Sequence, residues 1–104
     1  MKGTAYIYKV DGTIEKVDLD KPPELELLKK AVGGYIELVP GLNKIKRTPC
    51  VAFCNEEGKL QGLPLNIKAT ELWANSGAFK HILSDVLCGD VIVITGDEEL
   101  MRSL

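Results

Sequence analysis

The amino-acid sequence predicts an α+β fold: a single, mostly antiparallel sheet of five or six strands, with one main helix and one or two short helices packed on it. Three observations support this prediction. Two early segments alternate in polarity around a glycine turn, one later segment carries a helical apolar stripe, and a run of β-branched residues lies near the end. No repeat and no linker rich in Gly, Ser or Pro divides the chain, so residues 1–104 are expected to form a single domain.

The first two strands are expected at residues 4–10 and 13–17. Residues with a high β-propensity alternate along the first of them. Asp11 and Gly12 lie between the two strands, and this pair is preferred in a two-residue hairpin turn because glycine adopts a positive φ at little cost. The pattern therefore predicts an antiparallel hairpin.

The main helix is expected to begin near Pro22 and Pro23, since proline suits the first turn of a helix. It is expected to end at Gly33 and Gly34, because glycine readily adopts the left-handed cap conformation. Between these ends the apolar residues fall on one face, at Leu25, Leu28, Ala31 and Val32. A third strand is expected at residues 35–39, where Pro40 stops it.

The second half of the chain is expected to supply the interior strands. Residues 50–55 and 90–95 are apolar runs of strand length, and four consecutive β-branched residues in the second run suit the middle of a sheet. Residues 59–63 are compatible with a further strand that Pro64 would limit. Helical patterns begin at Asn66 or at Thr70, and again at residues 78–83.

Composition argues against several classes of function. A net charge of −2 is too small to create the field that attracts nucleic acid or an anionic membrane. The apolar runs fall far short of the roughly 18 to 20 residues that span a bilayer, and the start has no signal-peptide pattern. Three cysteines cannot all pair within one chain, which favours a reducing compartment. We therefore expect a soluble cytoplasmic protein without direct nucleic-acid or membrane contact.

The sequence favours a protein without a catalytic centre, metal or cofactor. Cys50 and Cys54 share one strand face, where cysteine serves as a small apolar residue. His81 is the only histidine and no Cys-x-x-Cys pair exists, so zinc binding is a weak alternative. Nucleophile elbows, phosphate loops and dinucleotide-binding turns are absent from the sequence. An enzyme that uses His81 or Cys88 is an alternative that the sequence favours less than a binding protein.

Residues 55–66 form the candidate binding segment. They combine polar side chains with glycines that allow a partner to approach the backbone, and a proline stiffens the exit. The candidate binding residues are Asn55, Glu56, Glu57, Lys59, Gly62, Asn66 and Trp73. Simpler accounts exist for several of them: residues 55–58 fit an ordinary turn, Asn66 suits a helix cap, and Trp73 suits the core.

Two oppositely charged patches are secondary candidates. A basic patch comprises Lys44, Lys46 and Arg47, and an acidic patch comprises Asp97, Glu98 and Glu99. Such clusters serve either as contact surfaces or as ordinary solvated surface.

Four blocks of sequence carry a family resemblance: AVGGYIE at residues 31–37, NEEGKL at 55–60, GLPLN at 62–66 and CGDV at 88–91. In order and spacing they resemble a family of small domains of unknown function from bacteriophages and conjugative elements. Family members are similar to proteins encoded beside antirestriction genes, and some relatives act as inhibitors of type II CRISPR nucleases. A basic insertion at residues 44–49 and a helical stretch at 69–87 depart from the family pattern.

The resemblance implies a counter-defence role in a bacterial host cell, in which the chain binds and inhibits a host defence protein such as a CRISPR nuclease. It supplies no catalytic residues. The alternative is a sponge that sequesters a nucleotide immune signal, which the polar segment and the nearby Trp73 suggest. The sequence leaves open whether the chain forms a homodimer.

Overall fold

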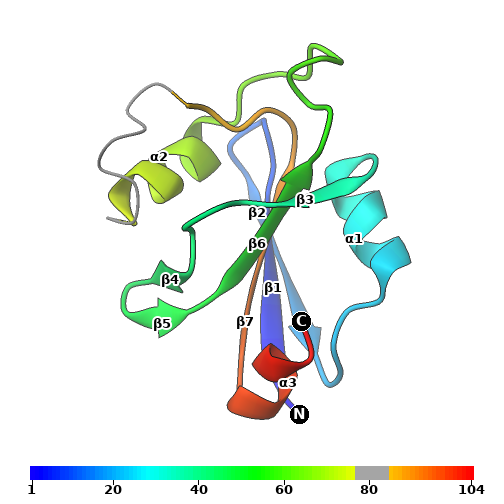
Figure 1. Ribbon diagram of the computed structural model, residues 1–104, viewed down its shortest axis with the longest axis vertical. Coiled ribbons are helices and arrows are strands. Elements are labelled where there is room, and N and C mark those ends of the chain that lie inside the picture. Colours follow the sequence, from blue (N-terminus) through cyan, green and yellow to red (C-terminus); the bar gives the residue numbers. More distant parts are fainter. Residues whose placement is uncertain (77–84) are drawn as a thin grey trace.

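The computed structural model describes residues 1–76 and 85–104. Within these residues one sheet has five antiparallel strands in the order β2-β1-β7-β6-β3 (Figure 1). The strands are β1 (Gly3–Tyr8), β2 (Ile14–Leu19), β3 (Ile36–Leu38), β6 (Val51–Asn55) and β7 (Val91–Gly96). A separate small hairpin consists of β4 (Lys44–Ile45) and β5 (Thr48–Pro49), and the helices are α1 (Leu25–Val32), α2 (Ile67–Asn75) and α3 (Glu98–Arg102). The predicted α+β class is confirmed.

Strand β7 is the centre of the sheet, as its run of β-branched residues predicts. It pairs with β1 on one side and with β6 on the other. Its first four side chains, from Val91 to Ile94, are 0% exposed. A strand buried on both faces needs apolar residues at every position, and β-branched side chains pack well on a pleated surface.

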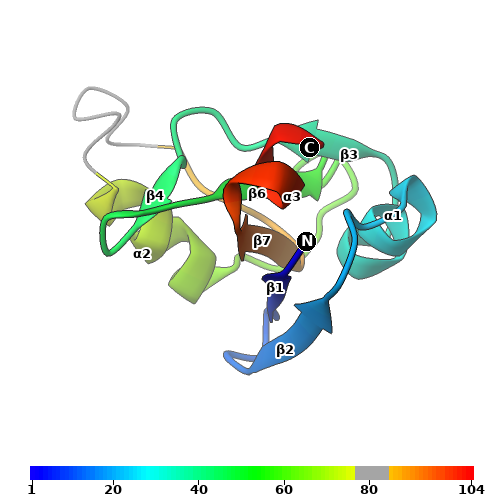
Figure 2. The same cartoon turned by 90° about the horizontal axis from the view of Figure 1, so that it is seen from below.

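The two faces of the sheet carry separate cores. On one face Val91 and Val93 pack with Ala69 and Trp73 of α2 and with Leu42, which precedes β4. On the other face the core contains side chains of β1, β7, α1 and α3, namely Ala5, Ile7, Ile92, Ile94, Leu28, Val32 and Leu100. Figure 2 shows α2 and α1 on opposite sides of the central strands. Cys50, Ala52 and Cys54 all lie with the α2 core, as their spacing predicts.

The β1–β2 connection is a three-residue loop and not the predicted two-residue turn. The Gly12 amide donates to the Lys9 carbonyl at 3.0 Å, and the Lys9 amide donates to the Thr13 carbonyl at 2.9 Å. Gly12 has a φ of 90°, which fits a type I turn followed by a glycine bulge. The Asp11 carboxylate accepts hydrogen bonds from the backbone and the hydroxyl of Thr13, so it stabilises the wider loop.

Helix α1 begins at Leu25, later than the predicted start near Pro22 and Pro23. Glu24 is extended and forms the N-cap, and its carbonyl accepts from the Leu28 amide at 3.2 Å, so both prolines precede the first helical residue. The predicted end is confirmed, because Gly33 is in the left-handed conformation and its amide donates to the Lys29 carbonyl.

Residues 59–62 form turns and residue 63 has no regular structure, so the further strand considered at residues 59–63 is wrong. The Gln61 amide donates to the Glu57 carbonyl, and the Leu63 amide donates to the Gly58 carbonyl. These backbone groups are therefore hydrogen-bonded locally and not to a neighbouring strand. Two further differences concern short elements. Residues 44–49 hold the β4–β5 hairpin, where the sequence predicts no strand, and residues 98–102 form α3, which the sequence does not predict. The helix expected at residues 78–83 lies outside the described residues.

Asn66 is fully buried, and its side chain joins three segments of the chain. Its Nδ2 group donates to the carbonyls of Tyr8 and Gly89 at 2.7 and 2.9 Å. Its Oδ1 atom accepts from the Ala69 amide at 3.1 Å, which confirms the predicted cap of α2. The end of β1, the approach to β7 and the start of α2 therefore meet at one amide.

Replacing Asn66 with Ala is expected to lower the free energy of unfolding by about 3 kcal/mol, because the cap is lost and two carbonyls lose their donor. Asn66→Asp is expected to cost at least as much, since a carboxylate keeps the cap but repels both carbonyls. The exposed Asn75 on the same helix supplies the control: Asn75→Ala is expected to change stability by about 0.5 kcal/mol or less. Urea denaturation measures all three; equal stability of Asn66→Ala and the parent protein would contradict this role.

Candidate functional site

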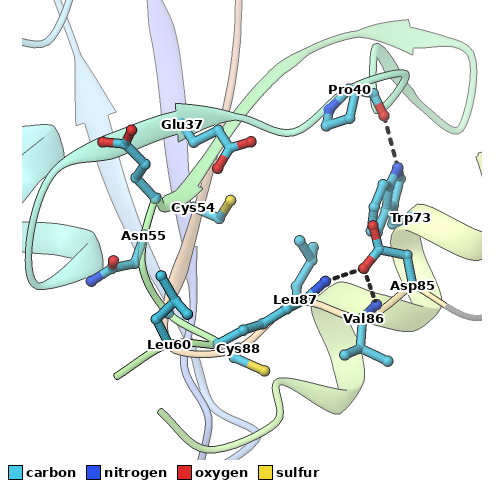
Figure 3. A pocket seen from close by; sticks show the side chains of 13 residues that line it. Glu37, Pro40, Cys54, Asn55, Leu60, Trp73, Asp85, Val86, Leu87 and Cys88 are labelled. Carbon is cyan, nitrogen blue, oxygen red and sulfur yellow. Dashed lines mark hydrogen bonds and ion pairs between the residues drawn. The ribbon is translucent and has the colours of Figure 1, made fainter. Parts of the chain in front are cut away.

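A cleft of about 380 Å³ opens beside the C-terminal end of β6. Its walls come from five parts of the chain: β3 and Pro40, the end of β6, residues 56–60, α2, and residues 85–88 before β7. In Figure 3, Glu37, Cys54 and Asn55 stand on one side of the opening, and Trp73 and Asp85 stand on the other. Long-range pairing of strands and loops creates this cleft.

Four of the predicted binding residues line the cleft: Asn55, Glu56, Lys59 and Trp73. The other three do not line it. Glu57 and Gly62 are exposed on the turns outside it, and Asn66 is buried with its side chain committed to the fold. The structure thus brings together part of the predicted set.

Asn55 is 6% exposed and serves mainly to hold the cleft together. Its Nδ2 group donates to the Val32 carbonyl at 3.2 Å, and its Oδ1 atom accepts from the Glu57 amide at 2.8 Å. Gly58 follows closely, where a Cβ atom would come within 2.8 Å of the Cys88 carbonyl oxygen. The asparagine and the glycine fix the turn against α1 and against the segment before β7.

Lys59 and Asp85 form an ion pair across the cleft. The hydrogen bond between them is the main reason that the pKa of Asp85 is lowered and the pKa of Lys59 is raised. Both charges are therefore present at neutral pH and offset each other. Both side chains are partly exposed to water, which screens the two charges, so their pairing contributes little to stability.

Two further carboxylates, those of Glu37 and Glu56, line the cleft and make its net charge negative. No ion pair involves either of them among residues 1–76 and 85–104. We refer to this cleft, with Glu37, Glu56, Lys59, Trp73 and Asp85 as its key residues, as the acidic cleft. It offers charge complementarity to a cation.

The acidic cleft also has apolar contact surface. Trp73 is fixed as a wall, because its indole N–H donates to the Pro40 carbonyl at 2.8 Å (Figure 3). Trp73 is 6% exposed and belongs to the core, as one of the two interpretations of the sequence held. Leu60 lines the cleft and is 89% exposed. An apolar side chain this exposed beside carboxylates suits a partner group with an apolar stem and a charged head.

Comparison with known protein families identifies the family of this chain. A family model described as a domain of unknown function, DUF3846, matches residues 1–104. The chain belongs to the DUF3846 family. No curated protein and no solved structure matches it significantly.

Cys54 lines the acidic cleft but is not an activated nucleophile. Burial, followed by the negative charge of Glu37, raises the pKa of its thiol from 9.0 to about 11. Burial also raises the pKa of Cys50 to about 11. A catalytic cysteine needs the opposite shift, because the thiolate is the reactive form. Both thiols therefore act as packing groups in this DUF3846 domain.

The described residues were compared with the requirements of a metal site and of a membrane-spanning helix. Across residues 1–76 and 85–104, no three His, Cys, Asp or Glu side chains are grouped closely enough to hold a metal ion. Among the described helices, none has the length and apolar character needed to cross a bilayer. His81, the weaker catalytic candidate, lies outside these residues.

The two charged patches differ in how far the fold explains them. In the acidic patch, Asp97 caps α3 by accepting from the Leu100 amide at 2.9 Å, and Glu98 forms an ion pair with Arg102. Backbone hydrogen bonds from Leu100 and Lys2 lower the pKa of Asp97. Glu99 lies in the first turn of α3, where a negative charge is favourable. Structural roles account for this patch.

The basic patch forms the exposed β4–β5 hairpin of this DUF3846 domain. Lys46 and Arg47 make its two-residue turn with positive φ values of 48° and 72°. Such a turn normally carries Asn and Gly, because larger side chains are strained there. Lys44 lies on the adjoining strand β4. No local structural role explains why cations occupy this turn.

The sequence did not identify Glu37, Cys54, Asp85 and Cys88 as members of one cleft. Glu37 reaches the cleft because β3 pairs with β6 and puts Glu37 opposite Cys54. Asp85 reaches it through its ion pair with Lys59, 26 residues away in the chain. Both contacts are long-range, so the local sequence around Glu37 and Asp85 carries no signal that places them in this cleft.

The raised pKa of Cys54 predicts slow alkylation of the folded protein. A variant that keeps Cys54 alone, with Cys50 and Cys88 replaced by Ser, is expected to react with iodoacetamide at pH 8 about 100-fold more slowly when folded than in urea. The reason is the smaller thiolate fraction at a pKa of about 11 than at 9.0. Mass spectrometry of timed samples measures both rates. A folded rate equal to or above the urea rate would contradict the assignment.

Proposed function

We propose that this chain is a non-enzymatic binding protein whose acidic cleft receives a basic segment of a partner protein. The observation that carries the proposal is the excess of carboxylates: Lys59 is neutralised by Asp85, which leaves Glu37 and Glu56 for a partner. Trp73 and Leu60 add apolar contact surface around these charges. Opposite charges across an interface accelerate encounter and select the partner.

We further propose that the partner is a host defence protein and that the chain acts in the cytoplasm of a bacterial host cell as a phage or mobile-element protein. The resemblance of residues 31–37, 55–60, 62–66 and 88–91 supports this role. The cleft chemistry is compatible with it. RNA-guided nucleases hold their nucleic acid in a positively charged channel, and an acidic cleft complements such a surface. The type II CRISPR nuclease is thus the first target to test.

A nucleotide sponge remains the second candidate, and one observation favours it. A separate cleft of about 340 Å³ lies between the β4–β5 hairpin and β1, lined by Tyr6, Tyr8, Ile45, Lys46, Thr48 and Thr95. An aromatic ring and a cation are the groups that bind a base and a phosphate. Calorimetry with cyclic dinucleotides and ADP-ribose derivatives tests this candidate. Binding that is lost in Lys46→Gln would support it, and the absence of heat would remove it.

Neutralising the acidic cleft is expected to weaken partner binding. The double variant Glu37→Gln/Glu56→Gln should bind a type II CRISPR nuclease about 10- to 100-fold more weakly, with a smaller dependence on salt, because two complementary charges are lost. Surface plasmon resonance with the purified nuclease measures the affinity, and a plasmid-interference assay measures protection.

The matched control is Glu98→Gln/Glu99→Gln on α3. It makes the same change in charge on a helix that follows the C-terminal end of β7. The acidic cleft lies at the other end of that strand, because its lining residue Cys88 precedes the start of β7. Its affinity is expected to equal that of the parent protein. The counter-defence proposal would be rejected if the parent protein does not bind the nuclease, recovers no defence protein from host lysate and does not protect a plasmid. Equal weakening by both variants would instead reject the cleft as the contact site.

A further inference from the structure

Strand β2 is one edge of the sheet, and its outer side has no partner strand among the described residues (Figure 2). It is six residues long, whereas β3 at the opposite edge has three. A long edge strand presents a row of unpaired N–H and C=O groups, which is a template for pairing with another strand. A strand that pairs with this edge has to match both its outward-facing backbone groups and its side-chain charges.

The hairpin loop determines which backbone groups face outward. The Lys9 amide donates to the Thr13 carbonyl, so residues 9 and 13 form a hydrogen-bonded pair. In an antiparallel ladder such pairs alternate with non-hydrogen-bonded pairs. The register pairs Ile7 with Glu15 and Ala5 with Val17, so Glu15 and Val17 bond to β1. The backbone groups of Ile14, Lys16 and Asp18 therefore point away from β1.

This alternation limits how the edge of β2 can pair with an antiparallel copy of itself. The two-fold axis that relates the two strands has to pass at a residue position and not between two residues. Only then do the outward-facing N–H and C=O groups of one strand lie opposite those of the other. An axis at Glu15, Lys16 or Asp18 puts two like charges directly opposite each other, which is destabilising. Among residues 15–18, only Val17 can lie on the axis without that cost.

With the axis at Val17, the charges of the edge become complementary. Lys16 of each copy lies opposite Asp18 of the other, so two ion pairs flank the axis. Lys16 and Asp18 are exposed, and across residues 1–76 and 85–104 neither takes part in an ion pair. These two residues are also the ones whose amides and carbonyls face outward. Side-chain charge and backbone geometry thus select the same register.

We propose that a second copy of this chain pairs with β2, with Val17 on the two-fold axis, so that the two five-stranded sheets form one continuous sheet. This inference is independent of the proposed function. Because β2 and β3 are opposite edges, the acidic cleft, which includes Glu37 of β3, stays open in both copies. The dimer therefore presents two clefts. One strand per copy is a small interface, so we expect a Kd on the order of 10 to 100 μM.

Charge exchange at the edge tests the register. Lys16→Asp places acidic residues at both positions 16 and 18, and Asp18→Lys places basic residues at both. Each variant alone is expected to sediment as an 11.4 kDa monomer over the concentrations at which the parent protein dimerises. An equimolar mixture of the two is expected to dimerise, because each Asp then faces a Lys. The double variant Lys16→Asp/Asp18→Lys, which has the parent composition, is expected to dimerise as well.

Backbone amide exchange locates the contact. At low concentration the amides of Lys16 and Asp18 should exchange rapidly with solvent, and at high concentration they should be protected. The amides of Glu15 and Val17 should be protected at both concentrations, because they bond to β1. A parent protein that stays monomeric up to about 1 mM would overturn the proposal. A dimer whose stability none of the charge variants alters, or whose Lys16 and Asp18 amides gain no protection, would overturn it too.

Discussion

The side-chain amide of Asn66 connects the end of β1, the approach to β7 and the start of α2, three segments that are distant in the sequence. Asn55 has a related role, because its amide connects the end of β6 to the end of α1. Between these two residues the chain satisfies many of its backbone groups in successive turns, and an isolated bridge pairs Leu65 with Cys88 near the end. The two buried amides and this bridge hold the polar segment in place, and the orientation of its outward side chains depends on them. The positions of Glu56 and Lys59 in the acidic cleft follow from this constraint.

Elements with a strong local signal could be predicted from the sequence. The β-branched run of β7 gave its central position, the apolar stripe gave α1, and Asn66 gave the start of α2. The prediction failed where distant contacts decide the conformation. Gly58 packs against the Cys88 carbonyl, 30 residues away, which fits turns at residues 59–62 and not a strand. The loop at Gly12 was misjudged because the Asp11 side chain stabilises a wider turn than Asp and Gly alone suggest.

The candidate site was predictable only in part, for the same reason. Glu56 and Lys59 were identified because they stand in a polar segment, whereas Glu37 and Asp85 reach the cleft through the sheet register and an ion pair. The resulting surface is acidic, and the basic β4–β5 hairpin is a separate surface. The two surfaces therefore differ in charge: the cleft is complementary to a cation and the hairpin to an anion. Under the proposed function, the excess of carboxylates makes the acidic cleft the first surface of this DUF3846 domain to test.

The preference of the acidic cleft for a cation is the central claim, and a titration of isotope-labelled protein with N-acetyl-arginine amide, followed by nuclear magnetic resonance, tests it most directly. We predict progressive, salt-sensitive shifts of the Asn55 and Glu56 amides and of the Trp73 indole N–H, all of which belong to the cleft. The same signals should not respond to a nucleotide monophosphate. Shifts scattered over the surface, or a cleft that responds to the nucleotide and not to the arginine derivative, would contradict the account.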